Sequence, residues 1–155
     1  MIRIAKKLNA DIKNGIKCAD FDNIPFDSCY FDCAFSIMTL HYSKDLLRTY
    51  REIYRVLRPG GELIIWDAHP LIGLFYSKTG IYLQSGEIVE FPTSVSADLK
   101  VSHPRFTLSD YFKAIRDSGF NLIDMEELEG KNSSSNEFNG FVIPTKLKII
   151  VKKPE

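Results

Sequence analysis

The sequence predicts an α/β domain, because apolar runs of strand length alternate with amphipathic helical patterns along its 155 residues. Residues 30–37 and 62–67 are short, mostly apolar runs of the kind that form strands buried on both faces of a sheet. Residues 120–125 and 147–152 predict two further strands, which we expect to form an antiparallel pair at the C-terminal end. A chain of this length suits one domain, so we expect a single unit over residues 1–155.

Two amphipathic helices are expected in the first half of the chain. Residues 1–9 carry apolar side chains at helical spacing and predict a short helix. Ser43 is placed to cap a second helix, which Pro59-Gly60-Gly61 would end, because proline cannot continue the hydrogen-bond ladder. The buried stripe of that helix is expected to consist of Leu46, Tyr50, Ile53, Tyr54 and Leu57.

The second half of the chain predicts a third helix and several irregular segments. Thr107 through Asp110 has the pattern of a capping box, and Gly119 is placed to end the helix that follows it. Residues 15–20 suggest a short strand that ends in an acid, and 131–136 a flexible loop. Within residues 71–103, Ser85-Gly86 separates 81–83 from 88–91, which predicts either a hairpin or a lid.

Charge and hydropathy exclude several classes of partner. Twenty basic residues balance twenty acidic ones, so a large basic surface for nucleic acid is not expected. No apolar run approaches the roughly 18 residues that span a bilayer, and the first residues lack a secretion signal, so we expect no membrane partner. Cys18, Cys29 and Cys33 form no metal-type pairs, which predicts reduced thiols, no zinc site and a cytoplasmic protein.

Ordered motifs run through residues 18–70 and continue downstream. They are Ala19-Asp20-Phe21-Asp22-Asn23-Ile24-Pro25-Phe26, Tyr30-Phe31-Asp32, Ser36-Ile37-Met38-Thr39-Leu40-His41-Tyr42, Arg55-Val56-Leu57-Arg58-Pro59-Gly60-Gly61, His69-Pro70 and Ser118-Gly119-Phe120. In this order they resemble the second half of the class I S-adenosylmethionine-dependent methyltransferases, of the small-molecule type. The resemblance implies a Rossmann-like methyltransferase sheet that lacks its first strands and ends in an antiparallel pair. It divides the chain into a cofactor-side part (1–70), a substrate lid (71–105) and a C-terminal helix with a strand pair (106–155).

The resemblance also implies a cofactor, S-adenosylmethionine, and residues that would bind it. Asp20 would accept a hydrogen bond from the adenine amino group, and Phe21 would lie beside the ring. Ser36 and Ile37 leave their strand at its carboxyl end, where ligands bind in open α/β sheets. The alternative for Asp20 is a solvated loop acid.

His41 and His69 are the candidate catalytic residues if the acceptor, a small molecule, must lose a proton. Asp67, at the end of the 62–67 strand, and His69 are expected at the same edge of the sheet as Ser36. The alternative is structural: His41 as a partly packed residue at a helix entry, His69 as a strand exit. Asp32 is interpreted as a structural turn acid. Four aromatic residues would either cover a substrate or pack in the core: Phe75, Tyr76, Tyr82 and Phe91.

The family's glycine-rich cofactor turn has no counterpart in the sequence, because none of the nine glycines forms Gly-x-Gly. By the resemblance, the chain is expected to be N-terminally truncated and of doubtful activity alone. Its 30–37 strand would then be an exposed edge that favours a homo-oligomer or a second chain completing the sheet. The alternative function is a non-catalytic binding or regulatory subunit, or a gene fragment. A nicotinamide-dependent oxidoreductase is disfavoured by the same missing glycines.

Overall fold

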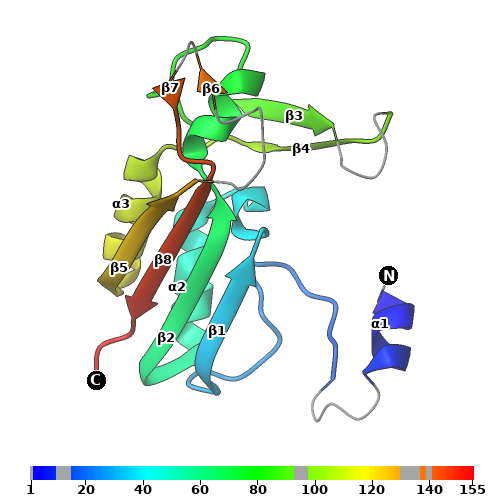
Figure 1. The fold of residues 1–155 in the computed structure, drawn as a ribbon. Helices are drawn as coiled ribbons and strands as arrows, with labels where there is room; N and C mark the ends of the chain where they lie inside the picture. Colours follow the sequence, from blue (N-terminus) through cyan, green and yellow to red (C-terminus); the bar gives the residue numbers. More distant parts are fainter. Residues whose placement is uncertain (1, 10–14, 93–97, 130–136, 139–140) are drawn as a thin grey trace.

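A four-stranded mixed sheet forms the centre of the computed structural model, which describes residues 2–9, 15–92, 98–129, 137–138 and 141–155 (Figure 1). The strand order is β1-β2-β8-β5, where β1 pairs parallel with β2 and both other pairings are antiparallel. The predicted α/β class and the antiparallel C-terminal pair, β5 with β8, are therefore confirmed. The strands span Phe31–Ile37 (β1), Leu57–Ala68 (β2), Asn121–Leu128 (β5) and Lys146–Lys152 (β8).

Two helices, α2 (Leu46–Val56) and α3 (Leu108–Ser118), lie on one face of the sheet (Figure 1). Alternate residues of β2 and β8 turn their side chains toward these helices, as the two-residue period of a strand requires. Neither helix, nor any other in the described part of the chain, is long and apolar enough to cross a membrane. The core between sheet and helices includes Leu46, Tyr50, Leu63, Ile65, Ile115, Leu147, Ile149 and Val151.

The ends of α2 differ from those expected. Asp45, not Ser43, is the N-cap, and its carboxylate accepts a hydrogen bond from the backbone N–H of Arg48 at 3.0 Å. Ser43 lies two residues earlier, where its hydroxyl accepts from the N–H of Asp45 at 3.1 Å. The helix ends at Val56, before the Pro-Gly-Gly segment, because Leu57 is already extended as the first residue of β2.

The capping box of α3 is confirmed. The Thr107 hydroxyl accepts from the N–H of Asp110 at 3.2 Å, and the Asp110 carboxylate accepts from the N–H of Thr107 at 2.8 Å. Gly119 ends the helix in the left-handed region, with a φ of 94° that favours glycine. The two signals at the ends of this helix therefore set its length.

Strand β1 is an edge, and its outer face is open. Phe35 and Ile37 are 70% and 67% exposed, so burial on both faces, which the apolar run suggested, is wrong for this strand. The expected exposed edge is confirmed. Residues 15–20 form no strand; they lie beside β1 in Figure 1 and contribute an isolated bridge between Asp20 and Asn23. The helix predicted over 1–9 is present as α1 (Ile2–Leu8).

A hairpin lies across the carboxyl end of β2 (Figure 1). It consists of β3 (Ile88–Pro92) and β4 (Lys100–Pro104), so the partner of the 88–91 segment is 100–104 rather than 81–83. Two short 3-10 helices, η1 (Leu40–Tyr42) and η2 (Pro70–Tyr76), follow β1 and β2. A small ladder joins β6 (Glu137–Phe138) to β7 (Phe141–Val142). The expected 131–136 loop lies outside the described residues.

Candidate active site

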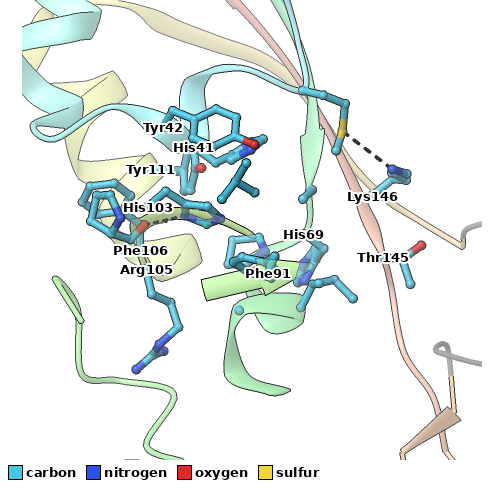
Figure 2. Close-up of a pocket in the computed structure, with 17 residues that line it drawn as sticks. His41, Tyr42, His69, Phe91, His103, Arg105, Phe106, Tyr111, Thr145 and Lys146 are labelled. Atoms are coloured by element: carbon cyan, nitrogen blue, oxygen red, sulfur yellow. Dashed lines mark hydrogen bonds between the residues drawn. The ribbon is translucent and has the colours of Figure 1, made fainter. Parts of the chain in front are cut away.

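A cavity of about 480 Å³ lies where the carboxyl end of β2 meets the β3–β4 hairpin (Figure 2). Its walls come from segments far apart in the sequence: η1, the end of β2, η2, the hairpin, α3 and the start of β8. This volume is in the range of small-molecule sites. Parallel α/β sheets place their ligands at this end of the strands.

The polar centre of the cavity is the pair formed by His41 and Asp67. Asp67 is completely buried at the end of β2, and His41 lies above it in η1. The Asp67 carboxylate accepts a short hydrogen bond from His41 Nδ1, a second from the His41 backbone N–H at 3.0 Å, and a third from the Ala68 N–H at 2.8 Å. Since an ionised carboxylate only accepts, Nδ1 carries the proton and Nε2 keeps its lone pair.

Two buried tyrosines lie close enough to Asp67 to respond to its charge. Burial, and then the Asp67 carboxylate, raise the pKa of Tyr111, which also lines the cavity. The same two causes raise the pKa of Tyr50, which lies beneath it in the core. Both phenols therefore stay protonated at neutral pH.

A second imidazole, His103 in β4, faces His41 across the cavity wall. The ring centroids of His41 and His103 are 4.8 Å apart, and His103 stacks on Phe91 at 4.8 Å with an interplanar angle of 9°. His103 Nδ1 donates to the Pro104 carbonyl at 2.9 Å, so its Nε2 is also an acceptor. Burial lowers the pKa of His103 and keeps this ring neutral.

The ring nitrogens of His69 are both hydrogen-bonded. Nδ1 accepts from the Leu71 N–H at 3.2 Å and so caps η2, while Nε2 donates to Glu127 on β5 at 2.7 Å. Burial lowers the pKa of His69 despite the carboxylate beside it. His69 thus connects the end of β2 to the edge of β5.

Arg105 lines the cavity and anchors the neighbouring loop of residues 81–87. Its side chain is 1% exposed, and its guanidinium donates to the carbonyls of Tyr82 at 2.8 Å, Ile81 at 2.6 Å and Gln84 at 2.5 Å. Its backbone also pairs with Gly86 and Glu87. A buried arginine whose guanidinium donates to three loop carbonyls holds that loop in one conformation.

The four residues expected to bind a cofactor share a second cavity, of about 330 Å³, beside β1. Asp20 is exposed, and its carboxylate accepts from the Phe21 N–H at 2.8 Å; Phe21 packs against the core. Ser36 is buried, and its hydroxyl has no hydrogen-bond partner, whereas Ile37 is largely exposed. An acceptor, an aromatic ring and an orphaned hydroxyl therefore surround this space.

The structure thus divides the expected site residues between two cavities. His41 and His69 line the larger one, and the four expected cofactor-binding residues line the smaller one. The sequence did not point to five further lining residues, because only the tertiary structure brings them to this cavity. The one local signal among them was the His103-Pro104 pair, which repeats the His-Pro pattern of residues 69–70. The five residues are His103, Arg105, Tyr111, Thr145 and Lys146. Phe91 lines the cavity, whereas Phe75, Tyr76 and Tyr82 lie outside its lining. The described residues contain no cluster of three metal-binding side chains.

Sequence comparison finds methyltransferases. Residues 1–65 match the family model described as a methyltransferase domain. A sterol 4-C-methyltransferase of Caenorhabditis elegans is 42% identical over 52 residues, which are 34% of this chain and 16% of that protein. A 2-phytyl-1,4-naphtoquinone methyltransferase of Nostoc punctiforme is 43% identical over 51 residues, 33% of this chain and 22% of that protein. The match therefore spans less than a quarter of either relative.

Comparison of structures extends the likeness to nearly the whole chain. An S-adenosylmethionine-dependent methyltransferase of Mesorhizobium loti gives a TM-score of 0.70 at 22% identity and covers 97% of this chain and 76% of that one. A methyltransferase of Methanosarcina mazei gives a TM-score of 0.66 at 19% identity and covers 99% of this chain and 77% of that one. The sequence match over residues 1–65 is to the methyltransferase domain family, and the likeness of structures shows a Rossmann-like methyltransferase fold.

Proposed function

We propose that this domain takes part in methyl transfer from S-adenosylmethionine to a small-molecule acceptor. The observation that carries the proposal is the His41–Asp67 pair, which presents the His41 Nε2 lone pair to a cavity at the carboxyl end of β2. The curated relatives are named as methyltransferases of sterols and of a naphthoquinone, both small molecules. The fold alone does not decide the activity, since it is shared with the cyclase SpnF at a TM-score of 0.64.

The cavity beside β1 suits the adenosine end of the cofactor. The Asp20 carboxylate would accept from the exocyclic amine, Phe21 and Ile37 would cover the ring, and the unpartnered Ser36 hydroxyl would gain a hydrogen bond. No glycine lines this cavity in the described part of the chain, so the fit is argued for that end only. When bound, the cofactor supplies a methyl group on an already activated sulfonium.

His41 would accept the proton from the hydroxyl of the acceptor at Nε2. Asp67 would orient the ring and stabilise the imidazolium that forms, so Asp67 is a positioning residue. The same role for His69 would require breaking its bond to Leu71 or to Glu127, and we therefore assign the proton to His41. The hairpin would exclude water from the reacting atoms.

The surroundings of the domain complete the proposal. The open edge of β1, with Phe35 and Ile37 exposed, favours pairing with a second copy or with another chain that completes the sheet. Its three cysteines are free and at least partly exposed, which is consistent with a cytoplasmic protein.

Calorimetric titration with S-adenosylmethionine tests the cofactor assignment. We expect saturable binding that Asp20→Ala weakens about tenfold, because a charge-assisted hydrogen bond is lost. Asp22→Ala is the matched control, since Asp22 is a nearby acid that pairs with Arg48 on the surface. No binding at millimolar ligand, or equal effects of the two substitutions, would contradict the assignment and favour a non-catalytic domain.

A further inference from the structure

The side of the large cavity away from His41 carries two polar groups without a strong partner. Thr145 is 8% exposed, and its hydroxyl is buried without a hydrogen bond. The neighbouring Lys146 directs its ammonium group to the thioether of Met38 at 3.6 Å, a weak acceptor. Figure 2 shows both residues on one side of His69, with His41 and His103 on the other. A buried hydroxyl left unpaired is unfavourable unless a ligand satisfies it.

The charge around this cavity is one-sided. None of the described lining residues is acidic. Asp67 lies behind His41, Glu127 is held by His69 Nε2, and Glu87 accepts from Ser77, Lys78 and Arg105, so the nearby carboxylates already have donors. The Arg105 guanidinium is directed to loop carbonyls, which leaves Lys146 as the cation available to a ligand among the described lining residues. An anionic group is therefore accepted here and a cationic one disfavoured.

We propose that the acceptor molecule is an organic acid, and that Lys146 and Thr145 bind its carboxylate. The ammonium group would form an ion pair with one carboxylate oxygen, and the Thr145 hydroxyl would donate to the other. This inference names the substrate class of the proposed methyl transfer. The reaction rests on the proposed function, whereas binding of the acid does not depend on it.

The remaining walls define the body of that molecule. The rings of Phe91, Tyr42 and Pro70 also line the cavity, so it suits a flat, apolar carbon skeleton. At the far side, the Nε2 atoms of His41 and His103 accept hydrogen bonds, which suits a hydroxyl group. The structure thus favours a hydroxy acid with an aromatic or similarly planar core.

Binding of para-hydroxybenzoate to the full chain, compared with the neutral para-hydroxybenzamide, tests this inference without any methyl donor. We expect the acid to bind about tenfold more tightly than the amide, because only the acid pairs with Lys146. Lys146→Met should remove that difference and leave the amide unchanged, and Lys146→Arg should restore most of it. Thr145→Val should weaken binding of the acid by a smaller factor than Lys146→Met does.

Lys148→Met is the matched control, since Lys148 lies two residues along β8 but already pairs with Asp124 at 3.0 Å and Glu126 at 2.8 Å. Equal binding of acid and amide, or equal loss in Lys146→Met and Lys148→Met, would overturn the inference. Thermal unfolding of each variant shows that it is folded. Acid binding without S-adenosylmethionine binding would contradict the methyl-transfer proposal alone, and the reverse result would contradict this inference alone.

Discussion

The two cavities at the carboxyl edge of the sheet differ in how completely the chain encloses them. The larger one has walls from η1, η2, the hairpin, α3 and β8, and hydrogen bonds of His41, His69 and Arg105 hold those walls together. The smaller one is bounded by β1, α2 and residues 19–24, with an exposed Asp20 at its rim.

This difference follows from the position of each strand in the sheet. β2 has a partner on both sides, so groups at its end, such as Asp67, are completely buried. Among the described residues β1 has a strand partner on one side only, and the cavity beside it shares that open edge. Groups that are buried among several elements are oriented before a ligand arrives, whereas groups at an open edge are ordered only in part. We therefore expect substitutions at the larger cavity to change stability strongly and substitutions at β1 to change it little.

Removing the Asp67 carboxylate is expected to have the largest effect. Asp67→Ala deprives three N–H donors of their buried acceptor, and we expect the free energy of unfolding to fall by about 2–4 kcal/mol. Urea denaturation measures this change. Asp32→Ala is the control, because the Asp32 side chain is 80% exposed and pairs with Arg58 on the surface. Similar losses in both variants would mean that the buried pair has no special stabilising role.

Removing the Arg105 guanidinium should act more locally. Arg105→Met frees three loop carbonyls, and we expect a loss of about 1–3 kcal/mol, concentrated in residues 81–87 and the hairpin. Hydrogen exchange of these amides should accelerate while α2 stays protected. Arg116→Met, at an exposed ion pair, should change neither region. Uniform acceleration across the chain would contradict the role of a local anchor.

Acidification should weaken the fold through His69 and His103. Burial lowers both pKa values in the folded chain, so between those values and about 6.5 the unfolded chain binds more protons. Stability is thus complete above about pH 6.5 and is lost as the pH falls through this window, by at most about 1.4 kcal/mol per pH unit for each ring. His69→Asn keeps an acceptor for the Leu71 N–H and should reduce the slope measured by urea denaturation at pH 7.5 and 5.5. An unchanged slope would refute the contribution of His69.

Substitutions at the open edge should affect stability least. Phe35→Thr with Ile37→Thr removes exposed apolar side chains and should change the free energy of unfolding by less than about 0.5 kcal/mol. If β1 mediates association, sedimentation velocity should show a shift of the wild-type oligomer toward monomer in this variant. A wild type that sediments as a monomer at every concentration would remove the proposed role of this edge.

The sequence predicted those elements whose signals are local. The capping box and Gly119 bound α3 correctly, and the apolar runs located β1, β2 and β8. The 15–20 strand was wrong because a short apolar segment needs a neighbouring strand to pair with, and periodicity does not reveal that neighbour. The pairing of 88–92 with 100–104 joins residues eight to sixteen apart in sequence, beyond the turn signal at Ser85-Gly86.

The candidate site, like the fold, was predictable only where its residues belong to local sequence motifs. His41 and His69 followed from the motifs, and the structure places both at one cavity. The direct bond between His41 and Asp67 joins residues 26 apart in sequence, and no local pattern specifies it. Lys146 and Thr145 come from the other end of the chain and reach the cavity through the antiparallel pairing of β8 with β2.

The proposed function depends most directly on the His41 tautomer, because Asp67 must hold the ring with its Nε2 lone pair free for an acceptor. Long-range proton–nitrogen correlation spectra of the ¹⁵N-labelled chain report the tautomer of each imidazole directly. We expect neutral His41 to carry its proton on Nδ1 in the wild type, and Asp67→Ala to abolish this preference. A His41 ring protonated on Nε2, or a tautomer unaffected by Asp67→Ala, would contradict the claim.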